Sequence, residues 1–145
     1  MEHAPQKYTH EDIFEGMRHC SSVTITPEML DDFAKVSGDY STLHMDDRYA
    51  AMVGFANGRV AHGALLLSFV SRIIGMYLPG ERALLQSISS QFRSPVYVGD
   101  DLEFDAIVVQ YSRENKIMVI KVIVRNQQTQ QIHATVKAQV GIRDR

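Results

Sequence analysis

The sequence predicts an α+β fold, with one domain in which a curved antiparallel β-sheet wraps around a long central hydrophobic helix. Three observations support this prediction. Residues 60–78 are strongly hydrophobic and have the length of one helix. After Pro79-Gly80, hydrophobic residues recur with a period of two over four segments, as in strands with one buried face. The reversals between these segments are short, which makes neighbouring strands antiparallel.

Residues 60–78, VAHGALLLSFVSRIIGMYL, place apolar side chains around most of the helix circumference rather than along one stripe. A helix of this kind is buried in a protein core or in a membrane. The segment is shorter than the roughly 20 residues that span a bilayer, and it contains Arg72. We therefore expect a core helix that is enclosed by the strands following it.

Each of the four later segments predicts a strand. In the clearest one, residues 132–140, Ile, Ala and Val alternate with His, Thr, Lys and Gln. Polar turn residues separate the segments. The predicted strands are residues 88–93, 102–112, 116–125 and 132–140.

The chain before the central helix predicts one strand and one amphipathic helix. Residues 1–16 are polar and are expected to form a loosely packed lead-in, and residues 21–26 are rich in strand formers. Thr26-Pro27 gives a helix start, with Thr as the N-cap and proline in the first helical position. Gly38 ends this helix, because glycine suits the left-handed backbone that follows many helices.

Residues 39–45 have neither a helical nor a strand period and predict a loop. A short helix at 47–53 is expected next, closed by Gly54, and Asn57-Gly58 marks a tight turn before the central helix. We therefore expect two irregular connections near the start of the central helix, both suited to hold functional side chains.

The net charge of −2, with scattered Lys and Arg, gives no electrostatic reason to expect a nucleic-acid partner. The single cysteine, Cys20, excludes an intramolecular disulfide and fits a reducing compartment. Residues 1–16 lack the apolar region of a signal peptide, and no membrane insertion is expected. These features predict a cytoplasmic protein.

Asp39 and His44 are the first candidates for chemistry. A carboxylate and an imidazole on one folded loop can hold a water molecule, take a proton from it and return a proton to a carbon, which is general acid–base catalysis. Histidine suits this role because its unperturbed pKa lies near neutrality. The alternative is structural: Asp39 closes the turn after Gly38, and His44 is a surface residue.

His62-Gly63 is the second candidate. A backbone N–H at the start of a helix, with no side chain in the way, can bind a carbonyl oxygen that gains negative charge. The alternative is that Gly63 allows close packing and that His62 is a core or capping residue. His19-Cys20 lacks partners at metal-ligand spacing, so no metal site is expected.

These features together resemble the MaoC-like (R)-specific enoyl-CoA hydratases and 3-hydroxyacyl thioester dehydratases. The resemblance runs strongly from Phe33 to Asp101 and continues in the C-terminal strands by pattern. It rests on three motifs in the family's order. They are Phe33, Ser37, Asp39, Leu43, His44, Asp46, Tyr49 and Ala50; then Val60-Ala61-His62-Gly63 with its Leu-rich helix; then Phe92, Pro95-Val96 and Gly99-Asp100.

The resemblance implies the hot-dog fold and a reversible syn hydration of trans-2-enoyl thioesters in fatty acid metabolism. It implies catalytic roles for Asp39 and His44 and a carbonyl site at the Gly63 N–H. It also implies a homodimer, a substrate carried by coenzyme A or acyl carrier protein, and no other cofactor. The remaining substrate-binding residues that it indicates are Ser41, His62 and Ser71.

The sequence departs from the family pattern where Ser41-Thr42 replaces Asn-Pro. A serine hydroxyl is shorter than an amide and rotates freely, and loss of proline loosens a loop. We expect the chemistry to survive and the substrate preference to change. Two alternatives stay open: a hot-dog acyl-CoA thioesterase that sends water to the thioester carbon, and a non-catalytic protein that binds acyl ligands.

Overall fold

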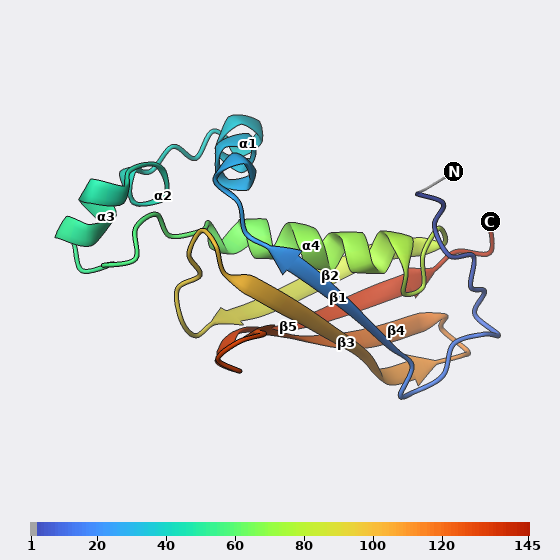
Figure 1. Ribbon diagram of the computed structural model, residues 1–145. Helices are drawn as coiled ribbons and strands as arrows, with labels where there is room; N and C mark the ends of the chain where they lie inside the picture. The colour runs from blue at the N-terminus through green and yellow to red at the C-terminus, as the bar shows by residue number, and fades with distance from the viewer. Residues whose placement is uncertain (1–2) are drawn as a thin grey trace.

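A computed structural model describes residues 3–145 as a five-stranded antiparallel sheet curved around one long helix (Figure 1). The strand order is β1-β3-β4-β5-β2, so β1 and β2 form the two edges. In chain order the elements are β1 (Arg18–Thr24), α1 (Pro27–Ser37), α2 (Thr42–Met45), α3 (Asp47–Met52), α4 (Gly63–Met76), β2 (Ala83–Phe92), β3 (Asp101–Ser112), β4 (Ile117–Asn126) and β5 (Ile132–Ile142).

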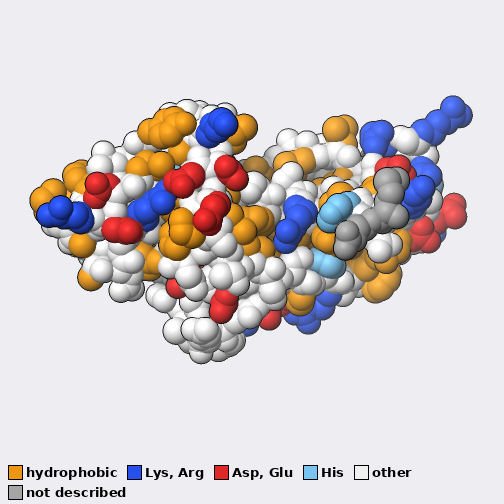
Figure 2. Space-filling view, turned by 45° about the horizontal axis from the view of Figure 1, so that its top comes forward, with side chains coloured by type: hydrophobic (Ala, Val, Ile, Leu, Met, Phe, Trp, Pro, Cys, Tyr) orange, Lys and Arg blue, Asp and Glu red, His pale blue; other side chains and the backbone are white. Residues whose placement is uncertain are grey.

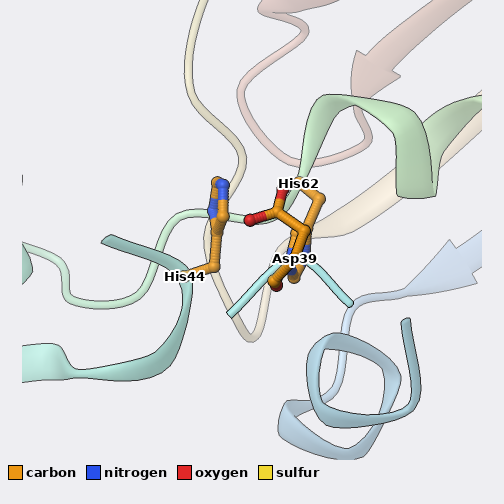
Figure 3. A group of neighbouring side chains, drawn as sticks. All are labelled: Asp39, His44 and His62. Atoms are coloured by element: carbon orange, nitrogen blue, oxygen red, sulfur yellow. The ribbon is translucent and has the colours of Figure 1, made fainter. Parts of the chain in front are cut away.

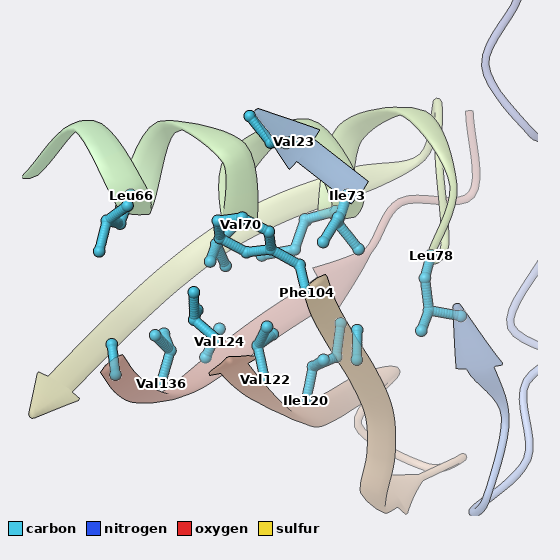
Figure 4. Packing of buried hydrophobic residues seen from close by; sticks show 14 of the residues in the cluster. Val23, Leu66, Val70, Ile73, Leu78, Phe104, Ile120, Val122, Val124 and Val136 are labelled. Atoms are coloured by element: carbon cyan, nitrogen blue, oxygen red, sulfur yellow. The ribbon is translucent and has the colours of Figure 1, made fainter. Parts of the chain in front are cut away.

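The core lies between α4 and the inner face of the sheet (Figure 4). Val70 and Ile73 of α4 are fully buried, and Phe104 of β3 is fully buried opposite them. The inner face of the sheet alternates with an outer face along β3, β4 and β5, as the period of two predicts. This arrangement is the hot-dog fold, and the predicted α+β class is confirmed.

The central helix is shorter and less completely buried than the sequence predicts. It begins at Gly63 instead of residue 60 and ends at Met76 instead of residue 78. The sheet covers one side of α4, while Ala64, Ser68, Ser71 and Arg72 on the other side are exposed. The prediction of a helix enclosed all round is therefore wrong for this chain by itself, because one sheet covers only one side.

Residues 3–16, the described part of the predicted lead-in, are mostly exposed, but they are attached to the core at several points. Ile13 is only 4% exposed and belongs to the core cluster. Backbone hydrogen bonds join Gln6 to the end of α4, and Gly16 to Val108 of β3. One apolar side chain and these backbone bonds hold the segment, although its composition is polar.

The predicted ends of α1 are confirmed. Thr26 accepts a hydrogen bond from the Met29 N–H at 3.3 Å, and Gly38 adopts a left-handed backbone with φ of 79°. The prediction of a loop throughout 39–45 is wrong, because residues 42–45 form the single helical turn α2. A run of four residues is too short to display a helical period.

Residues 38–62, called here the α2–α3 segment, extend beyond the start of α4 and away from the sheet (Figure 1). Over this region and α1, acidic and basic side chains are interspersed with hydrophobic ones on the face seen in Figure 2. That face therefore offers no continuous basic track. Within residues 3–145, no helix combines the length and the apolar character needed to cross a membrane.

Candidate active site

His44 lies in α2, and its ring orientation is fixed by the chain just before α4. The ring Nδ1 is 2.6 Å from the carbonyl oxygen of Val60. A carbonyl oxygen can only accept, so Nδ1 must carry the proton and donate it. In the neutral ring, the lone pair is then on Nε2. His44 thus presents a base at the ring nitrogen that the protein backbone does not use.

Asp39 follows the left-handed Gly38 at the end of α1, and local hydrogen bonds orient it. Its N–H donates to the Ser37 hydroxyl at 3.1 Å. Its carboxylate accepts a hydrogen bond from the Ser41 N–H, also at 3.1 Å, and this contact forms an Asx turn. The carboxylate is exposed and turns toward the His44 ring (Figure 3).

His62 lies behind this pair and contacts both members. It is 2% exposed, and its ring stacks on the His44 ring with centroids 4.0 Å apart and planes at 29°. Its Nε2 donates to the backbone carbonyl of Asp39 at 3.0 Å. Within the described residues, its buried Nδ1 has no hydrogen-bond partner. Phe33 of α1 packs against the same ring at 4.8 Å.

Asp39, His44 and His62 each direct one potential ligand atom to a common region, and these atoms lie within 4.8 Å of one another (Figure 3). The spacing alone would admit a metal ion. However, a metal ion must lie close to the plane of each imidazole that binds it, and the planes of these two stacked rings are inclined by only 29° at a centroid separation of 4.0 Å. The arrangement therefore suits a carboxylate–imidazole pair better than a shared metal ion.

Gly63, the first residue of α4, lies in the same pocket as His44. Its N–H belongs to the first turn, where no earlier helical carbonyl can accept it, and to the positive end of the helix dipole. The pocket has a volume of about 420 Å³. Its other walls are mainly apolar, and they are formed by Phe55, Val60, Ala61, Leu66, Phe92, Arg93, Ser94, Pro95 and Val96.

Phe92 at the end of β2 lies close against the Gly63 backbone. A Cβ atom at Gly63 would lie 3.1–3.3 Å from three atoms of the Phe92 ring, closer than ordinary contact. The ring is 51% exposed and therefore lies at the pocket surface beside the Gly63 backbone. The ring and the Gly63 backbone therefore line the same pocket.

A family model described as "MaoC like domain" matches residues 10–132. The chain belongs to the MaoC-like family. The match covers α1, the α2–α3 segment, α4 and most of the sheet, and so includes all the residues described above.

The MaoC-like proteins that the chain resembles are hydratases and dehydratases. An (R)-specific enoyl-CoA hydratase of Rhodospirillum rubrum is 32% identical over 111 residues, 77% of this chain and 76% of that protein. A mitochondrial 3-hydroxyacyl-[acyl-carrier-protein] dehydratase of Arabidopsis thaliana is 44% identical over 75 residues, 52% of this chain and 43% of that protein. The chain is accordingly a lyase of the hydratase and dehydratase type.

Among solved structures, the unliganded R-hydratase PhaJ1 of Pseudomonas aeruginosa superimposes with a TM-score of 0.89. The two chains are 27% identical, and the match covers 97% of this chain and 89% of the other. The likeness extends over the sheet, α4 and the α2–α3 segment together.

The structure brings Asp39, His44, His62 and Gly63 together, although 24 positions separate the first from the last. Ser41 lies beside them and contacts Asp39 through its backbone. Ser71 is exposed on α4 and is not part of the pocket lining. Substrate-binding roles for Ser41, His62 and Ser71 stay predictions.

The sequence analysis named Phe92 as part of a family motif but gave it no role at the site, and it missed Arg59. Arg59 has no periodic signal, although it comes directly before Val60.

A larger concavity of about 650 Å³ lies elsewhere, against outward-facing residues of the sheet such as Lys121, Thr135 and Lys137, and no candidate residue lines it.

Proposed function

We propose that this enzyme catalyses the reversible syn hydration of trans-2-enoyl thioesters to (R)-3-hydroxyacyl thioesters. The observation that best supports the proposal is the hydrogen bond from His44 Nδ1 to the Val60 carbonyl. It leaves Nε2 as a base in the pocket that also contains the Gly63 N–H. A base and a carbonyl-binding donor in one pocket are the two elements that the addition of water to an enoyl thioester requires.

In this mechanism Asp39 and His44 hold one water molecule between them. His44 Nε2 accepts a proton from the water as its oxygen bonds to C3 of the enoyl group. The C2–C3 π electrons move toward the thioester, and negative charge develops on its carbonyl oxygen. The Asp39–His44 pair, which holds the proton taken from water, then returns a proton to C2 on the same face, so that both additions occur on one face and the pair returns to its starting protonation state. The reverse sequence is dehydration.

The Gly63 N–H would stabilise the charge on the carbonyl oxygen. Removing one donor of this kind typically costs about 2.7–4 kcal/mol of transition-state stabilisation. The dipole of the 14-residue helix α4 adds to this effect, because its positive end lies at Gly63. Phe92 and Leu66 supply apolar surface for the acyl group next to the carbonyl.

No cofactor is part of the proposal, and the thioester carrier belongs to the substrate. The relatives act on both kinds of carrier by name, one on an enoyl-CoA and one on an acyl-carrier-protein thioester. Coenzyme A and acyl carrier protein therefore both remain substrates to test. We also propose a cytoplasmic location, since the single cysteine fits a reducing compartment.

A homodimer is a further part of the proposal. β2 is an edge strand, and it exposes Leu84 and Leu85 by 55% and 41%. An edge strand with exposed apolar side chains invites pairing with another chain. Sedimentation of the wild type and of Leu85→Lys would test this, with a monomeric wild type contradicting it.

The central experiment follows the loss of enoyl absorbance with crotonyl-CoA and with a longer trans-2-enoyl-CoA. Asp39→Asn should reduce turnover at least about 100-fold, while Asp32→Asn, a change at an exposed aspartate of α1, should not. Chiral analysis of the product should give the (R)-3-hydroxyacyl thioester. The acyl-carrier-protein thioester would be tried in the same assay.

Two results would contradict the proposal. Thiol release from a saturated acyl-CoA, without enoyl hydration, would indicate a thioesterase. Binding of acyl thioesters with no turnover of either carrier's substrates would indicate a non-catalytic protein.

A further inference from the structure

Arg59, in the chain just before α4, makes hydrogen bonds to both His44 and α1. Its Nε donates to the backbone carbonyl of His44 at 2.6 Å, and one Nη donates to Asp31 of α1, also at 2.6 Å. The Arg59 side chain is only 12% exposed, whereas Asp31 is 55% exposed. The Arg59 N–H donates to Asp47 at the start of α3. Arg59 thus links the two helices that flank α2.

The neighbouring residue, Val60, holds the same part of α2 from the other side. Its N–H donates to the Leu43 carbonyl at 3.2 Å, and its carbonyl accepts His44 Nδ1. Residues 59–60 therefore contact the backbone at 43 and 44 and the His44 ring. Together these contacts define both the position and the tautomer of His44.

α2 has little else to hold it in place. It is one turn long, contains no buried residue and has no side-chain hydrogen bond at its N-cap, Ser41. Leu43, His44 and Met45 are only half-buried, so the hydrophobic burial that fixes most helices is limited here. The polar contacts from residues 59–60, together with the stack of His62 on the His44 ring, therefore determine where that ring lies.

We infer that Arg59 is a positioning residue that fixes His44 for catalysis, an inference that rests on the proposed function for its kinetic consequence. Arginine suits this position because its planar fork donates from Nε and Nη at the same time, in different directions. The Asp31 carboxylate accepts a hydrogen bond from the Arg59 Nη, and the Arg59 Nε donates to the His44 carbonyl. Lysine, with one terminal nitrogen, cannot make both contacts with this geometry. Thus Arg59 restrains α2 at the His44 carbonyl, two residues after the Ser41-Thr42 departure from the family pattern.

The kinetic test compares Arg59→Lys with Asp31→Asn and with a matched control, Arg48→Lys. Arg48 is exposed on α3, and its side chain makes no hydrogen bond within residues 3–145. Misplacing a catalytic group by about 1 Å can cost 100-fold. We expect kcat to fall roughly 10- to 100-fold in Arg59→Lys with KM changed less than about threefold. Asp31→Asn, which keeps the Nε contact, should lose less, and Arg48→Lys should match the wild type.

A spectroscopic test does not depend on turnover. Nitrogen-15 NMR of the ring distinguishes the two neutral histidine tautomers. Wild type and Arg48→Lys should show His44 with its proton on Nδ1, whereas Arg59→Lys should show loss of that single tautomer. Thermal unfolding of each variant separates displacement of α2 from loss of the fold.

The inference fails if Arg59→Lys is folded and keeps both the wild-type kcat and the Nδ1 tautomer. It also fails if kcat falls only in proportion to the folded fraction. Absence of turnover in the wild type would instead overturn the proposed function, and the NMR comparison would still decide whether Arg59 fixes the ring.

Discussion

The sheet with α4 and the α2–α3 segment are held together by different forces. In the sheet and α4, the inner side chains are almost completely buried, and Phe104, Val70 and Ile73 are fully so. In the α2–α3 segment, α2 has no buried residue and α3 buries only Ala50. Apart from Val60, Ala61 and His62, which are buried next to α4, its geometry depends on hydrogen bonds and on the Arg59–Asp31 ion pair.

Because of this difference, one region should determine the stability of the protein and the other its catalytic activity. Apolar burial is the main source of folding free energy, so the sheet and α4 should determine how stable the protein is. The sheet and α4 form the scaffold, and the α2–α3 segment carries His44 and Asp39 on it while adding little buried surface. Functional loops are commonly arranged in this way. Changes in the two regions should therefore affect different measurements.

The largest effect on chemistry is expected for His44→Ala. Loss of a general acid–base typically lowers the rate 10²- to 10⁴-fold, about 2.7–5.4 kcal/mol of activation free energy. Stability should fall by only about 1 kcal/mol, the value of the hydrogen bond to Val60. Steady-state kinetics and urea unfolding on the same preparation would check both. A fully active variant would contradict the assignment of His44 as the base.

Phe104→Ala should have the opposite pattern. Phe104 is fully buried and packs edge-to-face on Phe69 of α4, with centroids 5.7 Å apart. Its truncation should reduce the free energy of unfolding by about 3–5 kcal/mol. Among the molecules that remain folded, kcat should stay near the wild-type value. A large loss of kcat at unchanged stability would show that the two regions are not separable.

Gly63→Ala tests the point where the two regions meet. The substitution keeps the N–H but places a Cβ 3.1 Å from the Phe92 ring. Because that ring is half exposed, it can move, and we expect little loss of stability. The displaced ring would crowd the carbonyl site, and the rate should fall about tenfold, or 1.4 kcal/mol.

Gly75→Ala is the matched control for this prediction, since a Cβ there meets nothing within 4 Å. It should leave the rate unchanged and stabilise α4 by up to about 1 kcal/mol. Adding Phe92→Leu to Gly63→Ala should restore part of the lost activity. An equal loss of rate in both glycine variants would mean that Phe92 is not the cause.

Most of the sheet could be predicted from the sequence because burial on one face leaves a period of two. β3, β4 and β5 confirm this, with ends displaced by one or two residues. β2 begins at Ala83 rather than 88, because this edge strand exposes Leu84 and Leu85 and so has no alternation in its first half. β1 covers 18–24 rather than 21–26, because two of its three less exposed positions are His19 and Ser21, and only Val23 is apolar, so its alternation in burial leaves no apolar period.

The site could be predicted only in part. Asp39, His44 and Gly63 are recognisable from residue types and family motifs, but spacing alone could not show that they meet. Their meeting depends on how residues 59–62 fold back on residues 39–44. The stack of His62 on His44 and the Arg59 contacts arise from this return of the chain. Such contacts have no sequence period, and so neither could be predicted.

Thr42→Pro is expected to have the smallest effect, and it tests whether the α2–α3 segment can be made more rigid. Thr42 is the first residue of α2, a position that favours proline. Ser41 has φ of −53° and ψ of 132°, the extended backbone that precedes proline without strain. The variant should gain about 0.4–1 kcal/mol of stability and keep or raise kcat. Leu43→Pro is the contrasting control, since it would force Thr42 out of the helical backbone. If Thr42→Pro lost activity while Leu43→Pro did not, His44 would depend on motion of α2 rather than on its fixed position.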